Sequence, residues 1–184
     1  MNSQRYTGTA IALHWLMAVL LATTFCVGLY MADLPLSPWK LKVFSWHKWA
    51  GVTAFLLAIA RLAWRVSHQP PALPIAMPNW QQRAARWGHG LLYLLMFALP
   101  ISGWLMSSAK GFPTVYFGVL PVPDLVPKNK ELGDLLLDVH QALAWTLAGV
   151  VAGHAGVALM HHFFDHDDVL VRMLPRRRLR GDRS

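Results

Sequence analysis

The sequence has one cysteine and few charged residues, and both shortages exclude classes of protein. Cys26 has no partner for a disulfide, for a Cys-x-x-Cys metal or redox pair, or for covalent cofactor attachment through Cys-x-x-Cys-His. Charged residues make up 14% of the chain and hydrophobic residues 55%, whereas about a quarter of a soluble protein is charged. This composition indicates a chain of one domain that lies within a lipid bilayer.

Acidic residues are also scarce, which leaves a formal net charge of +8. The basic residues lie in short segments between long apolar runs and form no stripe interleaved with polar residues, so nucleic-acid binding is not indicated. The middle of each apolar run lacks carboxylates, which argues against a proton pump or an ion transporter, because these proteins carry charged relays at membrane depth.

Four apolar stretches, residues 9–31, 41–64, 84–108 and 135–163, are long enough to cross the hydrocarbon core, which needs roughly 20 helical residues. The first is too long for a signal-peptide core and lacks a clear cleavage site, so we expect it to be a retained span. Proline-rich segments before the third and fourth stretches predict loops. The sequence therefore predicts an all-α, up-and-down membrane bundle of four helices, with one domain over residues 1–184 and a basic tail at 164–184.

The basic residues are distributed unequally between the two ends of these spans. One side carries Arg5, Arg61, Arg65, Arg83, Arg86, Arg172, Arg176, Arg177, Arg178, Arg180 and Arg183. The other carries Lys40, Lys42, Lys48, Lys110, Lys128 and Lys130, offset by Asp33, Asp124, Glu131, Asp134 and Asp138. The positive-inside rule predicts that both termini are cytoplasmic.

Histidines inside the apolar stretches are the strongest candidates for function, because intramembrane polar residues are rare and costly. His140 and His154 are separated by 14 residues, which places them only about 40° apart around a helix and roughly 21 Å apart along it. His47 lies at the depth of His140, and His14 at the depth of His154. The fourth span thus contributes one histidine to each of two pairs.

Paired imidazoles suit haem, because two of them fill both axial positions of the iron and leave a centre for electron transfer. The sequence therefore predicts two haems b held without covalent bonds, one per pair. The alternative for each histidine is a hydrogen bond between helices, and a zinc site is disfavoured because the histidines lie at two separate levels. His89 could replace His14 as the partner of His154, or could bind a haem propionate or a quinone.

Seven short stretches resemble the bacterial cytochrome b561 family, which is related to the cytochrome b subunits of formate dehydrogenases and hydrogenases. The resemblance covers nearly the whole chain, and its order of motifs is more specific than any single one. The stretches are residues 12–16 (ALHWL), 47–51 (HKWAG), 61–65 (RLAWR), 88–90 (GHG), 99–104 (LPISGW), 161–163 (HHF) and 170–175 (LVRMLP).

The resemblance implies that His47 and His140 hold an outer haem and that His14 and His154 hold an inner one, so that His89 is not the first choice as a ligand. It also implies a protein of the bacterial inner membrane that exchanges electrons with ubiquinone. The branch that this chain resembles includes superoxide oxidases, which convert superoxide to oxygen and pass the electron to quinone. A homodimer is compatible with so small a bundle.

The positions of other polar residues suggest candidate sites for quinone and for superoxide. His161 returns to the face of His154 about 10 Å closer to the cytoplasm, where it could contact a quinone or simply lie at a helix end wet by headgroups. Arg61 could assist in binding the quinone or pair with a haem propionate, and His89 is a further quinone candidate. Lys48 and Lys110 could attract a small anion to the outer haem, although these lysines could also form only a solvated rim.

Two other functions are compatible with the same sequence. One is an electron-transfer subunit that docks to a dehydrogenase, and the other is a haem-free sensor or structural bundle whose histidines bridge helices. A superoxide:ubiquinone oxidoreductase is the preferred function, and its donor is the part that depends on the resemblance alone.

Overall fold

The computed structural model describes residues 5–73 and 77–175. Four long helices dominate it: α1 (Gly8–Asp33), α2 (Pro38–Ser67), α3 (Asn79–Ala109) and α4 (Lys130–Phe163). Each is long and apolar enough to cross a membrane, which confirms the prediction of an all-α bundle with four spans. The predicted tail extends to residue 184, and its last nine residues, 176–184, lie outside the described part.

Every helix begins before its apolar stretch, because apolar composition marks only the part inside the bilayer, and polar caps set the start of α1, α2 and α4. The side chains of Thr7, Ser37 and Asn129 accept hydrogen bonds from backbone N–H groups in the first turns of α1, α2 and α4. Helix α3 starts at Asn79, directly after Pro78 and five residues before the predicted boundary at 84.

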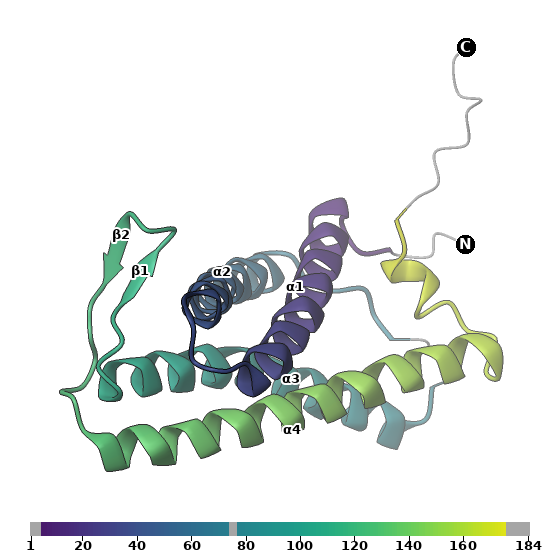
Figure 1. Ribbon diagram of the computed structural model, residues 1–184. Helices are drawn as coiled ribbons and strands as arrows, with labels where there is room; N and C mark the ends of the chain where they lie inside the picture. Colours follow the sequence, from purple (N-terminus) through teal and green to yellow (C-terminus); the bar gives the residue numbers. More distant parts are fainter. Residues whose placement is uncertain (1–4, 74–76, 176–184) are drawn as a thin grey trace.

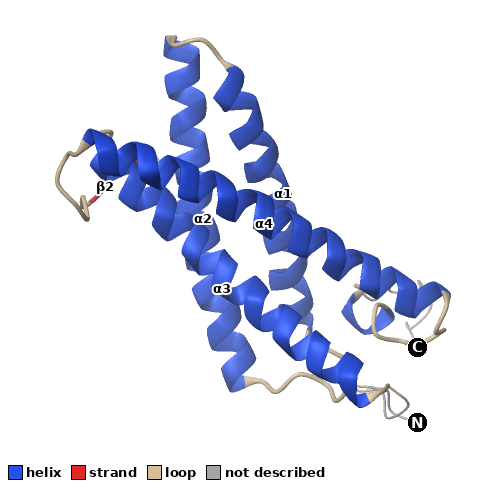
Figure 2. Cartoon of the chain, turned by 90° about the horizontal axis from the view of Figure 1, so that it is seen from below, coloured by secondary structure: helices blue, strands red, loops and turns tan. Residues whose placement is uncertain are grey.

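The helices form two pairs, α1 with α2 and α3 with α4, and α2 packs against α3 to join them. The pairs cross rather than run parallel, as Figures 1 and 2 show. We call the end where α1 begins and α4 ends the terminal end, and the opposite end the hairpin end. Because α1 packs mainly on α2, and α4 mainly on α3, direct packing between α1 and α4 is sparse among the described residues.

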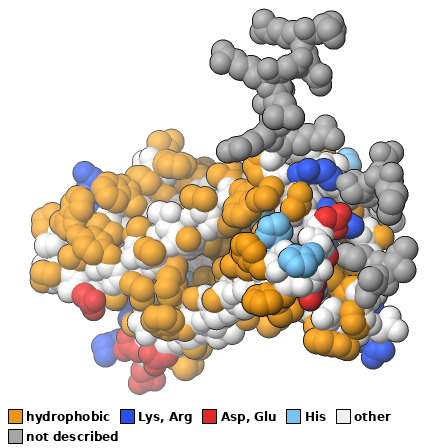
Figure 3. Space-filling model, turned by 90° about the vertical axis from the view of Figure 1, so that its right-hand side faces the viewer, with side chains coloured by type: hydrophobic (Ala, Val, Ile, Leu, Met, Phe, Trp, Pro, Cys, Tyr) orange, Lys and Arg blue, Asp and Glu red, His pale blue; other side chains and the backbone are white. Residues whose placement is uncertain are grey.

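A small core lies where α1, α2 and α3 meet. Met17, Ala58 and Met96 are buried there, and Leu21, Leu57, Tyr93 and Phe97 pack around them. Most other apolar side chains face outward, for example Trp87, which is 80% exposed, and hydrophobic side chains cover much of the face in Figure 3. A protein with so apolar a surface is stable when lipid tails cover it.

The segment between α3 and α4 was predicted to be a loop, and the structure corrects this in part. It contains a short antiparallel hairpin of β1 (Thr114–Tyr116) and β2 (Leu120–Val122). Gly118, with a φ of +74°, provides the left-handed conformation that the turn requires. The hairpin is fixed to α2, because Trp49 Nε1 donates to the carbonyl of Val115 at 2.7 Å.

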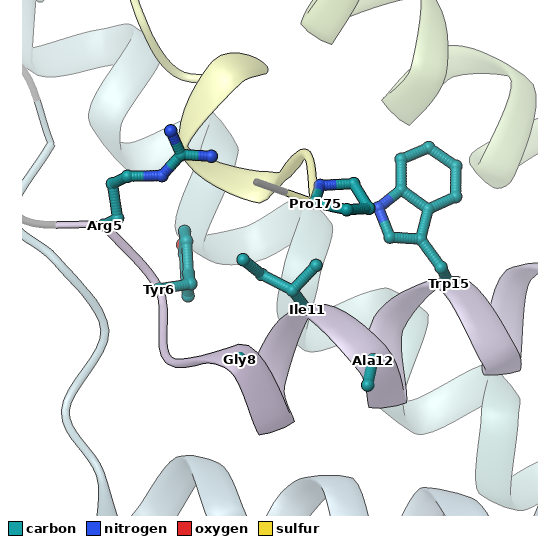
Figure 4. A pocket seen from close by; sticks show the side chains of 7 residues that line it. All are labelled: Arg5, Tyr6, Gly8, Ile11, Ala12, Trp15 and Pro175. Carbon is teal, nitrogen blue, oxygen red and sulfur yellow. The ribbon is translucent and has the colours of Figure 1, made fainter. Parts of the chain in front are cut away.

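The first and last described segments lie together at the terminal end. Arg5 donates to the carbonyls of Val171 and Leu174, at 2.9 and 2.7 Å, and Trp15 Nε1 donates to the carbonyl of Met173 at 2.9 Å. These carbonyls belong to or flank the 3-10 helix η1 (Val171–Met173), which Figure 4 shows beside α1. The contacts place the start of α1 and the end of the chain's described part on one side of the bundle.

Candidate functional site

Four of the histidines in the apolar stretches form two pairs across the gap between α4 and the α1–α2 pair. The ring centres of His47 and His140 are 6.2 Å apart, and those of His14 and His154 are also 6.2 Å apart. The first pair lies toward the hairpin end and the second toward the terminal end. The structure thus brings together both pairs predicted from sequence, and axial ligation by these pairs stays a prediction.

The ring spacing fits two imidazoles on opposite sides of one metal ion. A bond from an imidazole nitrogen to a metal is about 2 Å long, and the ring centre lies about 1 Å beyond the nitrogen, so two opposed rings have centres about 6 Å apart. Direct hydrogen bonding or stacking between the rings would require a shorter approach. In each pair the rings meet at a steep angle, 79° and 61°, rather than stacking.

The hydrogen bonds of His140 leave its Nε2 ready to bind a metal. The Ser102 hydroxyl donates to the carbonyl of Leu99 at 2.8 Å, so its oxygen is free to accept from His140 Nδ1 at 3.0 Å. A proton on Nδ1 leaves a lone pair on Nε2, which is the tautomer of a metal-bound histidine. Ser102 was not singled out from the sequence, although it lies within the motif at residues 99–104.

Two glycines make room for the rings of the hairpin-end pair. A Cβ added at Gly28 of α1 would lie 3.2 Å from Cε1 of His47, and one added at Gly103 of α3 would lie 3.0 Å from Cε1 of His140. A side chain at either position would therefore push its histidine out of place. The sequence does not identify these glycines, because their role depends on how consecutive helices rotate and pack against each other.

Nδ1 of His47 is buried, and the backbone of Thr24 offers the acceptor that lies near it. The two rings of the hairpin-end pair thus combine a tautomer suited to ligation at His140 with a spacing of 6.2 Å. These features fit haem b bound through two imidazoles.

The terminal-end pair has a different environment, because Arg61 of α2 lies against it. Arg61 Nη2 is 2.8 Å from His14 Nδ1, and a guanidinium can only donate, so Nδ1 accepts and the ring proton is on Nε2. A metal-bound histidine keeps its proton on the other nitrogen. Haem binding by His14 therefore requires this contact to open.

His89 of α3 is the third histidine at the terminal end, and its ring centre lies 5.2 Å from that of His154. Its Nδ1 donates to the carbonyl of Ala85 at 2.7 Å, which fixes the ring against its own helix. The shorter spacing departs from the 6.2 Å shared by the two other pairs. By ring spacing His14 is the better partner of His154, in line with the family resemblance, and the choice of ligand stays a prediction.

His161 is buried at the end of α4 with two carboxylates close to it. Its Nδ1 lies 2.9 Å from Oδ2 of Asp165 and 2.9 Å from Oδ2 of Asp167. Neither contact has hydrogen-bond geometry, so Nδ1 makes no hydrogen bond within the described residues. The sequence predicts His161 as a candidate but not its contact with the aspartates, because the chain must turn back after α4 to bring them to the ring.

The two lysines proposed to attract an anion already have partners. Lys48 Nζ donates to the carbonyl of Phe112 at 2.7 Å, and Lys110 Nζ pairs with Asp134 at 2.9 Å. Lys130 also approaches Asp134, at 3.5 Å. Both lysines therefore hold the hairpin-end loop in place, and this leaves less of their charge for steering.

Comparisons with known proteins agree with these features. The family model described as prokaryotic cytochrome b561 matches residues 5–176. Cytochrome b561 homolog 2 of Escherichia coli (strain K12) is 39% identical over 93% of this chain and 92% of its own length, and Cytochrome b561 homolog 1 of the same organism is 31% identical over 95% and 99%. A protein of Yersinia pestis named probable superoxide oxidase CybB is 30% identical over 95% and 98%. The chain belongs to the prokaryotic cytochrome b561 family and is a bacterial membrane protein of electron transfer.

Proposed function

We propose that this chain is a di-haem membrane cytochrome that oxidises superoxide and reduces ubiquinone. The observation that carries the di-haem part is the equal spacing of 6.2 Å in two histidine pairs that share one helix. His47 and His140 would hold one haem b, and His14 and His154 the other. When bound, these groups supply one-electron redox chemistry at two depths of the membrane.

The balance of the reaction requires two superoxide ions for each quinone. Each superoxide loses one electron and becomes oxygen, and ubiquinone gains two electrons and two protons. The excess of arginine at the terminal end supports a cytoplasmic location for both termini in the inner membrane. Superoxide would then be oxidised at the hairpin end, on the periplasmic side.

Superoxide as the electron donor is supported by the relative named a probable superoxide oxidase, which is 30% identical over nearly the whole chain. Lys48 and Lys110 contribute less to attracting an anion than their charges suggest, because each already has a partner. The ubiquinone site is proposed at the terminal end, where His161 lies at the end of α4 and Arg61 and His89 lie beside the histidine pair.

The test is reduction of the purified protein by enzymatically generated superoxide, with a ubiquinone analogue as the acceptor. We expect a reduced b-type haem spectrum that superoxide dismutase abolishes, and we expect quinol to accumulate in the stoichiometry above. Reduction that is unaffected by the dismutase would exclude superoxide as the donor. A purified chain without b-type absorption would refute the di-haem proposal itself and favour a haem-free bundle.

A second candidate is an electron-transfer subunit that docks to a dehydrogenase. It is favoured by the exposed apolar side chains of the hairpin, where Phe117, Val119 and Leu120 are 60%, 83% and 61% exposed. Replacing Val119 and Leu120 with serine should prevent co-purification of such a partner and leave superoxide-driven reduction unchanged. Co-purification of a dehydrogenase that reduces the haems faster than superoxide would favour this candidate.

A further inference from the structure

The terminal end contains a basic pocket that shares His89 with the proposed quinone site and extends beyond it. Its volume is about 390 Å³, and it lies between the end of α2, the first turns of α3 and the segment before α1. Three cationic or titratable side chains line it, Arg65, Arg86 and His89, and Tyr6 and Gln82 add polar atoms. The backbone of residues 70–73 closes one side.

The two arginines of this pocket have no carboxylate partner within the described residues. The ion pairs found at the terminal end join Arg172 with Asp168 and His161 with Asp165 and Asp167. Arg65 instead lies over the ring of Tyr93, 5.9 Å from its centre, and Arg86 is exposed. Two uncompensated guanidinium groups lining one concave site favour an anion, and guanidinium binds phosphate in a bidentate manner.

A second, mainly apolar pocket shares Tyr6 with the first, and its one charged lining residue, Arg5, is engaged by the carbonyls of Val171 and Leu174. Its volume is about 520 Å³, and it runs along the first two turns of α1 past Gly8, Ile11, Ala12 and Trp15 (Figure 4). The direction from Gly8 to Trp15 leads from the helix end toward the middle of the bilayer. A basic pocket at the helix ends followed by an apolar channel toward the hydrocarbon matches the two parts of a phospholipid.

We propose that these adjoining pockets bind one anionic phospholipid, with its phosphate at Arg65 and Arg86 and an acyl chain along α1. Basic pockets between membrane helices are common sites for anionic lipid headgroups. The site does not include the C-terminal arginines, because every lining residue belongs to residues 5–89 or is Pro175. Its position beside His89 would place a lipid phosphate next to the terminal-end histidine pair.

The test is lipid retention by the haem-loaded protein. The protein is extracted from vesicles of mixed phosphatidylcholine and phosphatidylglycerol, and its bound lipids are identified by native mass spectrometry. We expect selective retention of phosphatidylglycerol. Retention should fall about fivefold in Arg86→Gln or Arg65→Gln and about 25-fold in the double variant, because each arginine near an anionic headgroup raises the affinity about fivefold. Arg83→Gln is the matched control, because Arg83 is exposed on the same turn of α3 but does not line the pocket.

Several outcomes would overturn the proposal. Equal retention of both lipids, or an equal loss in Arg83→Gln, would show that no specific pocket is involved. Displacement of the lipid by millimolar inorganic phosphate at constant ionic strength would identify a soluble anion as the ligand. Loss of haem from the Arg65 and Arg86 variants without loss of lipid would assign the pocket to haem carboxylates. Quinone reduction plays no part in these measurements, so they are independent of the proposed reaction.

Discussion

The two histidine pairs have the same ring spacing but different surroundings. At the hairpin end, His47 and His140 lie against glycines, and Ser102 fixes the tautomer of His140. At the terminal end, His14 contacts Arg61, and the pair has a third histidine for a neighbour. The hairpin-end pair is thus positioned by close packing, whereas the terminal-end pair is positioned by polar contacts that can rearrange.

This difference has consequences for a bound haem. A tightly packed site without a nearby guanidinium favours fixed geometry and strong ligation. A site beside a cation favours the more reduced state of the iron, because reduction lowers the positive charge next to the arginine. The same ligand set can therefore form two centres of unequal potential, as a directional electron path across a membrane requires.

Removal of an axial histidine should have the largest effect on the two haem centres. We expect His47→Ala or His140→Ala to remove one haem and His14→Ala or His154→Ala to remove the other, since iron loses one of its two axial nitrogens. Haem content per protein, measured as the pyridine haemochrome, should fall by about half in each case. His162→Ala is the control, and loss of haem in His89→Ala with retention in His14→Ala would reverse the terminal-end pairing.

A bulky residue at Gly103 should damage only the hairpin-end centre. Gly103→Val places atoms where even a Cβ would be 3.0 Å from His140, so the ring must move and we expect that haem to be lost or bound in altered geometry. Optical and paramagnetic resonance spectra of the two centres provide the measurement. Gly90→Ala in the same helix, where an added Cβ meets no atom within 4 Å, should leave both spectra unchanged.

Loss of the Ser102 hydroxyl should weaken the same centre without abolishing it. Ser102→Ala removes the acceptor for His140 Nδ1, and loss of such a partner weakens metal binding about 10- to 100-fold. Haem titration of the apoprotein would show one of the two sites weakened. Ser102→Thr retains the hydroxyl and should restore much of the affinity, and equal weakening of both sites would contradict the assignment.

Loss of the Arg61 charge should have the smallest effect and should act on the terminal-end centre. We expect Arg61→Gln to lower the midpoint potential of that haem by the equivalent of about 1–2 kcal/mol, the interaction of two charges at about 8–16 Å with an effective dielectric constant of about 20. Potentiometric titration would resolve the two haems. A shift of the hairpin-end haem instead, or an equal shift in Arg83→Gln, would contradict the role of Arg61.

Much of the architecture could be predicted from the sequence because the bilayer imposes it. Apolar runs of sufficient length must be helices, since no water is present to satisfy an open backbone. The spacing of His140 and His154 required one helix face and two depths, and the structure has partners at both depths. The hairpin was missed because prolines around Thr114 and Leu120 favour a loop, although the glycine turn and contacts with α2 stabilise two short strands.

The amino-acid sequence alone determined the four spans and the stripe of histidines on α4, because hydrophobicity and helical periodicity are local properties. Only the tertiary structure placed Gly28 against His47, Gly103 and Ser102 against His140, and Arg61 against His14. Each of these contacts joins helices whose relative rotation and crossing depend on packing along their whole length. The two histidine pairs can therefore be located from sequence, whereas their unequal surroundings depend on how the helices cross.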